Sequence, residues 1–78
     1  MIKELSNKII FDDFISKTIL TSDELEILEM LIKKFSIVKI SSELSMSDRN
    51  VSRIIKDLKI KYKNYKKLEL AKNDIFNS

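Results

Sequence analysis

Within five consecutive residues the chain carries four polar side chains that can hydrogen-bond nucleic-acid bases, namely Arg49, Asn50, Ser52 and Arg53. Arginine can bond guanine through two parallel hydrogen bonds, asparagine can do the same with adenine, and serine can bond either kind of base edge. These edges are exposed in the DNA major groove, which admits an α-helix. The chemistry that this spacing favours is recognition by hydrogen bonding, provided that one helix carries the four side chains on its outer face.

The surrounding sequence predicts such a helix over residues 48–60. Apolar residues recur at helical spacing and form its inner face, made of Val51, Ile54, Ile55 and Leu58. Ser47 precedes this helix as a candidate N-cap. A shorter helix is predicted over residues 37–44, with Ser36 as its cap, and the short turn 45–47 joins the two. A short helix, a tight turn and a longer second helix make up a helix–turn–helix unit, which places its second helix in the major groove.

Two further helical segments are predicted before this unit. Residues 2–19 carry apolar side chains at intervals near three and four, which predicts a packing helix, with a dimerisation helix as the alternative. Thr21 and Glu24 have the spacing of a capping box, in which each residue's side chain accepts the other's backbone N–H. They predict a second helix that runs to about Lys34 or Phe35.

The C-terminal part, residues 64–78, is predicted to be helical but without a definite start. Tyr62, Tyr65 and Leu68 continue an apolar stripe at helical spacing. The helix that begins at residue 48 can therefore run on unbroken, or it can bend near Asn64 so that a fifth helix begins. The sequence leaves both possibilities open.

The chain contains no Gly and no Pro, which removes helix breakers and the turns that need a positive φ. This absence favours an all-α fold. We expect one small domain of four to five helices that contains a helix–turn–helix. Its parts are an N-terminal packing or dimerisation helix over residues 1–19, a helix–turn–helix core over 21–63, and a C-terminal helix and tail over 64–78.

The composition also argues against an enzyme. There is no Cys and no His, so thiolate and imidazole metal ligands and the commonest general base are missing. A Gly-rich phosphate loop is excluded because it needs glycine. The carboxylates at Asp23, Glu24 and Glu26 fit helix capping and solvation better than acid–base chemistry, because no nucleophile stands near them. We expect no catalytic residue, no metal and no cofactor.

The chain has no apolar run near the 18 residues that a membrane-spanning helix needs. Its first ten residues mix charged and apolar side chains, unlike a secretory signal. We therefore expect a cytoplasmic protein that does not enter the membrane.

The net charge of +3 is unevenly distributed along the chain. Residues 1–46 carry six Lys and eight Asp or Glu, a net charge of −2, whereas residues 47–78 carry nine Lys or Arg and four Asp or Glu, a net charge of +5. Such an asymmetry favours nucleic acid or another anionic surface as partner. The lysines of residues 59–67, interleaved with Tyr62 and Tyr65, fit either a nucleic-acid patch or a solvated face whose aromatic rings dock on the core.

Residues 20–63 resemble the helix–turn–helix shared by LuxR-type (GerE-like) regulators and the fourth region of bacterial sigma factors. Those families begin with Leu-Thr followed by acidic residues, and this chain has Leu20-Thr21 with Glu24. Their Glu-Ile-Ala, two variable residues, Leu, Gly, Ile, Ser segment aligns without gaps with residues 39–47, KISSELSMS. Their recognition helix starts near a Thr-Val pair, which here is Asn50-Val51.

The chain departs from this family pattern at several positions. Ser45 replaces the usual turn Gly, so we expect a non-Gly residue at positive φ, at a cost of roughly 1 kcal/mol. Ser41 replaces the usual Ala and Lys39 the usual Glu. The Gly-containing loop before the last helix of LuxR-type domains is missing, and the basic stretch 56–67 resembles the sigma version more closely.

From these observations we expect a sequence-specific DNA-binding transcriptional regulator, in which helix 48–60 enters the major groove of double-stranded DNA. Arg49, Asn50, Ser52 and Arg53 are the candidate base-contacting residues. The candidate phosphate-contacting residues are Thr21, Ser36, Lys39, Ser47, Lys56 and Lys59. One unit makes few contacts, so a homodimer on paired half-sites is expected. The alternatives are a protein-binding module of the same fold acting on RNA polymerase or a sigma factor, and a structural or membrane-surface helical protein.

Overall fold

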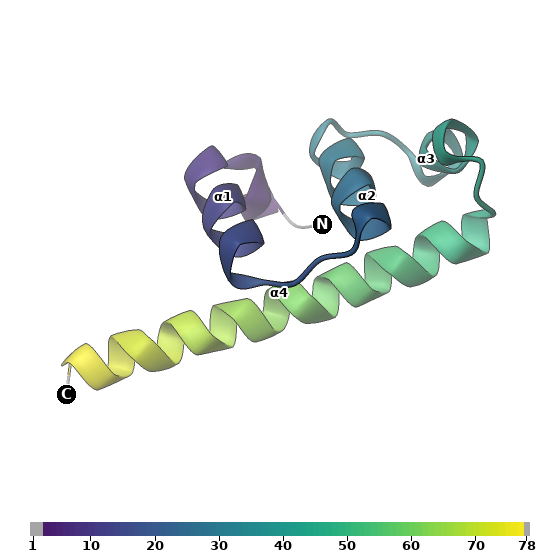
Figure 1. Ribbon diagram of the computed structural model, residues 1–78. Coiled ribbons are helices and arrows are strands. Elements are labelled where there is room, and N and C mark those ends of the chain that lie inside the picture. The colour runs from purple at the N-terminus through teal and green to yellow at the C-terminus, as the bar shows by residue number, and fades with distance from the viewer. Residues whose placement is uncertain (1–2, 78) are drawn as a thin grey trace.

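The computed structural model describes the backbone of residues 3–77 and the side chains of residues 4–68. Four α-helices follow a short 3-10 helix, and no strand occurs in this part of the chain (Figure 1). The predicted all-α class is confirmed. The elements in order are η1 (Lys3–Ser6), α1 (Lys8–Lys17), α2 (Ser22–Ile32), α3 (Ile37–Leu44) and α4 (Asp48–Asn77).

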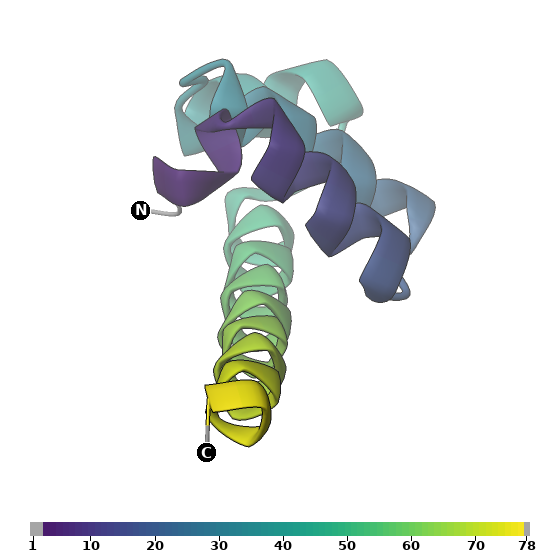
Figure 2. The same cartoon turned by 90° about the vertical axis from the view of Figure 1, so that its left-hand side faces the viewer.

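The longest element is α4, a single helix of 30 residues along which the other helices lie (Figure 1). It answers the question left open by the sequence, because the chain neither bends nor breaks near Asn64. Without Gly or Pro nothing in this stretch interrupts the helical hydrogen bonds. The molecule is accordingly elongated, with extents of 49 × 20 × 19 Å, and the C-terminal end of α4 projects beyond the other helices (Figure 2).

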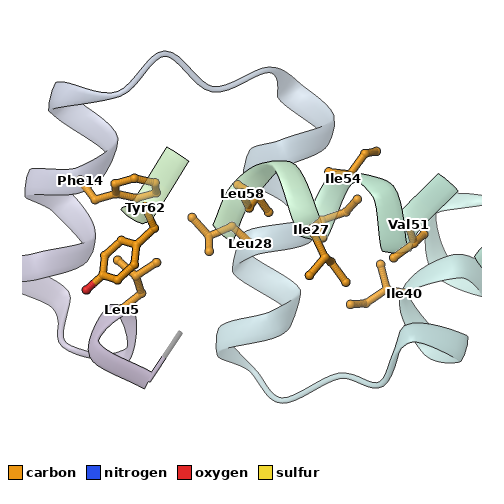
Figure 3. Packing of buried hydrophobic residues seen from close by; sticks show 10 residues of the cluster. Leu5, Phe14, Ile27, Leu28, Ile40, Val51, Ile54, Leu58 and Tyr62 are labelled. Carbon is orange, nitrogen blue, oxygen red and sulfur yellow. The ribbon is translucent and has the colours of Figure 1, made fainter. Parts of the chain in front are cut away.

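The hydrophobic core forms where α1, α2 and α3 meet one face of α4 (Figure 3). The contribution of α4 is the predicted inner face extended by one turn: Val51, Ile54, Ile55, Leu58 and Tyr62. The other elements contribute Leu5, Phe14, Ile27, Leu28 and Ile40. Near the middle of α4 the Phe14 and Tyr62 rings pack edge to face, with centroids 5.4 Å apart. The core therefore fixes which side of α4 faces inward.

The N-terminal segment differs from the single helix expected over residues 2–19. It is divided at Asn7, whose side-chain oxygen accepts the backbone N–H of Ile9 at 2.9 Å and caps α1. The preceding η1 turn brings Leu5 into the core, where it is 1% exposed. Asn is among the strongest N-cap residues, so Asn7 was the local signal for this boundary.

The start of α2 agrees with the prediction, whereas its end does not. Both hydrogen bonds of the capping box are present: Thr21 Oγ1 accepts from Glu24 N at 3.1 Å, and Glu24 Oε1 accepts from Thr21 N at 2.9 Å. The helix ends at Ile32 because Lys34 turns into the left-handed region, with φ 66°. Phe35 N then bonds Met30 O at 3.0 Å, the closing pattern of a Schellman motif. This ending was missed because its left-handed residue is a lysine instead of a glycine.

The connection between α3 and α4 has the predicted length and the predicted strain. Ser45 has φ 54° and ψ 41°, which is the left-handed conformation expected where the resembled families have Gly. Met46 N bonds Ser41 O at 3.0 Å and closes α3, and Ser47 Oγ accepts from Asn50 N at 3.1 Å and caps α4. Three residues thus connect the two helices and satisfy part of the unpaired backbone groups at both helix ends.

We expect Ser45→Gly to raise the free energy of unfolding by about 0.5–1 kcal/mol, because glycine adopts the left-handed conformation without a Cβ clash. The matched control is Ser42→Gly within α3, which should lower that free energy by a similar amount. Chemical denaturation followed by circular dichroism measures both. If both variants were destabilised equally, Ser45 would not hold a left-handed conformation in solution.

Candidate nucleic-acid interface

The four predicted base-contacting residues lie together in the first two turns of α4, on or beside the face turned away from the core. Arg49, Ser52 and Arg53 are exposed, and Asn50 is half-buried. The neighbouring side chains Val51 and Ile54 point inward and anchor this end of the helix. The structure therefore presents these four side chains as one cluster, which we call the reading end.

Two members of the reading end are bonded to each other. Arg53 Nη2 donates to Asn50 Oδ1 at 2.9 Å, one helical turn apart. The bond orients the Asn50 amide and leaves its NH2 group as a donor, and the carbonyl oxygen keeps a second lone pair. The bond holds the Asn50 and Arg53 side chains next to each other at the start of α4.

The predicted phosphate-contacting hydroxyls all have structural roles as N-caps. Thr21 caps α2, Ser47 caps α4, and Ser36 Oγ accepts from Lys39 N at 3.2 Å to cap α3. In each case the hydroxyl oxygen is the acceptor, so its proton stays available to donate to a further group. All three residues are exposed.

The predicted phosphate-contacting lysines are exposed as well. Lys56 and Lys59 belong to α4, one and two turns beyond the reading end. Lys39 lies on α3, and its ammonium stands 4.2 Å from the centre of the Phe35 ring, a cation–π contact. The structure thus supplies positive charge from two adjacent helices.

A shallow groove of about 450 Å³ runs along α4 from Arg53 to Lys61, beside the start of α2. Its charged lining consists of three carboxylates, Asp23, Glu24 and Asp57, and two cations, Arg53 and Lys61, of which Lys61 pairs with Glu24. The carboxylates of Asp23 and Asp57 would repel a phosphate placed against this flank. Of the predicted phosphate contacts, Thr21 is the one that lies against these carboxylates.

Lys61 binds the start of α2 to α4. Its ammonium donates to Glu24 Oε1 at 2.7 Å and to the backbone oxygen of Ile19 at 3.0 Å. Burial alone would raise the pKa of Glu24, but the Lys61 ammonium, its charge and the Thr21 backbone N–H outweigh burial and lower it. Sequence reasoning assigned Glu24 to capping alone. Its second partner lies 37 residues away, and no local pattern signals such a contact.

Two further contacts fix the aromatic residues of the basic stretch. Tyr62 is buried against Phe14, and the Tyr65 hydroxyl donates to Asp13 Oδ2. Burial of Tyr62, and secondly the charge of Glu4, raise the pKa of its hydroxyl. Both aromatic rings of residues 59–67 therefore dock on the core, so any contact of this stretch with nucleic acid would be made by its lysines.

Comparison of the chain with models of known protein families matches none of them, and comparisons with curated proteins and with solved structures find no match either. Within the described part of the chain, no helix combines the length and apolar character needed to cross a membrane. The same residues contain no group of three or more acidic, Cys or His side chains that could hold a metal ion.

The lowered pKa of Glu24 predicts a pH-dependent contribution to stability. A carboxylate whose pKa is lower in the folded state stabilises the fold fully above its ordinary pKa, here 4.5, and loses this effect as the pH falls through the lower folded value. Glu24→Gln keeps an acceptor for the Thr21 N–H but removes the charge. We expect a loss of about 1 kcal/mol at pH 7, since Lys61 is partly exposed.

Urea unfolding at pH 7 and at pH 3 tests this expectation. The gap between the native protein and Glu24→Gln should narrow at the lower pH, whereas Glu26→Gln, an exposed position on the same helix, should change stability little at either pH. A gap that stayed constant with pH would show that the charge of Glu24 does not stabilise the fold.

Proposed function

We propose that the chain is a sequence-specific DNA-binding transcriptional regulator in which α3, the turn and α4 act as a helix–turn–helix. The observation that carries the proposal is the reading end: Arg49, Ser52 and Arg53 are exposed at the start of a helix whose opposite face is held in the core. Side chains at the N-terminal end of a second helix are the ones that meet base edges in this type of unit.

The neighbouring elements support the same orientation. Ile40 and Val51 are both fully buried in the core that α3 and α4 share, so the angle between these helices is set by apolar packing. Lys56 lies one turn beyond the reading end on α4, and Lys39 is exposed on the neighbouring α3. In the proposed complex they bond phosphates and set the position of α4, while the reading end selects the bases.

A homodimer is part of this proposal. One helix in one half-site gives few base contacts, and two copies on half-sites one helical turn apart double them.

A substitution at Arg53 that keeps the positive charge distinguishes base recognition from general electrostatic attraction to DNA. We expect Arg53→Lys to keep general attraction to DNA but to lose discrimination at one base pair, by about 1–3 kcal/mol, because lysine lacks the planar two-donor geometry. Lys59→Ala should instead weaken binding to all sequences alike and reduce the salt slope by about one. Selection of duplexes from a random pool followed by mobility-shift titration measures both effects. Unchanged preference in Arg53→Lys would rule out Arg53 as a base-reading residue.

A second candidate is a protein-binding module of the same fold that acts on RNA polymerase or a sigma factor. It is favoured by a groove of about 610 Å³ between the end of α1 and α4, beside which Ile19 is 92% and Leu68 66% exposed. Exposed apolar side chains next to a groove are a common feature of protein-binding surfaces.

Salt and a surface variant distinguish the two candidates. Under the second candidate, Ile19→Ser with Leu68→Ser should weaken a complex with purified polymerase or sigma factor, and that complex should persist at moderate salt because apolar contacts are not screened. Ile9→Ser, on the exposed side of α1, is the control. Titration of the labelled protein with each partner at 50 and 200 mM salt measures this. DNA binding that falls steeply with salt, without any such complex, would reject the second candidate.

A further inference from the structure

The outward face of α4 carries a charged stripe that continues well beyond the reading end. Residues at spacings of four, three, four, three and four share one side of a helix. On α4 these residues are Arg49, Arg53, Lys56, Ile60, Lys63 and Lys67, and all six are exposed. Five are basic and none is acidic. We call this set the outer stripe.

Four of the five lysines of residues 59–67 fall into two pairs according to the face of α4 on which they lie. Lys61 bonds Glu24 and Ile19, and Lys66 bonds Glu4 Oε1 at 3.2 Å and stands 5.8 Å from the centre of the Tyr62 ring. The ammonium groups of these two lysines are therefore paired with side chains of α2 and η1. Lys63 and Lys67 have no ion-pair partner among the residues whose side chains are described, and they belong to the outer stripe.

The length of the outer stripe exceeds what one major groove can hold. Eighteen residues separate its ends, which corresponds to about 27 Å along a straight helix. The major groove is about 12 Å wide. A rigid helix whose first turns lie in the groove must therefore leave it before Lys67, because α4 has no break at which it could turn back. The residues beyond the exit meet the sugar–phosphate backbone, if they meet DNA at all.

No other element blocks this approach. The helices α1 and α2 pack on the opposite face of α4, and the projecting end of α4 carries its C-terminal residues away from them (Figures 1 and 2). The groove that Asp23 and Asp57 line runs along α4 from Arg53 to Lys61 and does not include Lys63 or Lys67. Positive charge is therefore unopposed on the outer side of the part of α4 that bears these two lysines.

We propose that Lys63 and Lys67 form a second contact surface, which binds the phosphates that flank the groove occupied by the reading end. This inference rests on the proposed DNA-binding function and adds to it a sequence-independent clamp. The reading end selects the bases, and the two lysines extend the bound length of duplex beyond the half-site. Ile60 is the uncharged residue of the outer stripe between these two surfaces.

The test uses a double variant that combines Lys63→Gln and Lys67→Gln. Its matched control is a second double variant that combines Lys8→Gln and Lys33→Gln. The control removes the same charge from the α1–α2 side, where Lys8 and Lys33 line a different groove. Affinities for the selected duplex and for an unrelated duplex are measured by mobility shift at 50 and 200 mM salt. All four positions are exposed, and circular dichroism confirms that both variants fold.

The clamp predicts that the double variant binds both duplexes more weakly by the same factor and that its salt slope falls by about two. The advantage of the native protein should consequently shrink about tenfold between 50 and 200 mM salt. It should also disappear on a duplex shortened to the half-site, where no flanking phosphate remains. An effect equal to that of the control, or one that persists on the shortened duplex, overturns the clamp while the DNA-binding proposal stands. A native protein that binds no duplex at 50 mM salt overturns both.

Discussion

The burial of one face of α4 is the constraint on which the rest of the structure depends. Leu58 and Val51 are fully buried there, and each of the other helices covers part of the same face. Burying one such side chain contributes about 1.5–3 kcal/mol, and a chain of this size has little stability in reserve. Rotation of α4 about its axis would expose several of these side chains at once. The face of α4 that is turned to the outside is consequently fixed by the core.

Packing also decides which charges a partner encounters. The basic half of the chain contains several lysines that are equivalent in composition, but Lys61 and Lys66 are held by carboxylates of the body. The Lys61–Glu24 pair joins the cap of α2 to α4, so one ion pair supports both a helix start and a helix contact. The charge left for an outside partner is smaller than the composition suggests. Five basic side chains, those of the outer stripe, share the side of α4 that faces away from the core.

Local signals predicted helix starts better than helix ends. The capping residues Thr21, Ser36 and Ser47 were each identified correctly, because an N-cap bonds a backbone N–H only two or three residues away. The positive φ of Ser45 was also predicted, from a resemblance in which glycine occupies that position. The left-handed Lys34 was missed because lysine has no intrinsic preference for that conformation, which here accompanies the hydrogen bond from Phe35 N to Met30 O. Of the candidate site, sequence reasoning found the reading end but neither its Asn50–Arg53 bond nor the extent of the outer stripe.

The sequence by itself determined the all-α class, the turn between α3 and α4, and the inner face of α4, since all three depend on residue types at short fixed spacings. Only the tertiary structure decided that Lys63 and Lys67 are exposed on the outer side of α4 while Lys61 and Lys66 are paired. These outcomes depend on contacts between residues as much as 62 positions apart, such as Lys66 with Glu4. Helical periodicity depends on residues that are neighbours along the chain. Whether a lysine faces solvent or an ion-pair partner depends on which distant segment the core packs beside it.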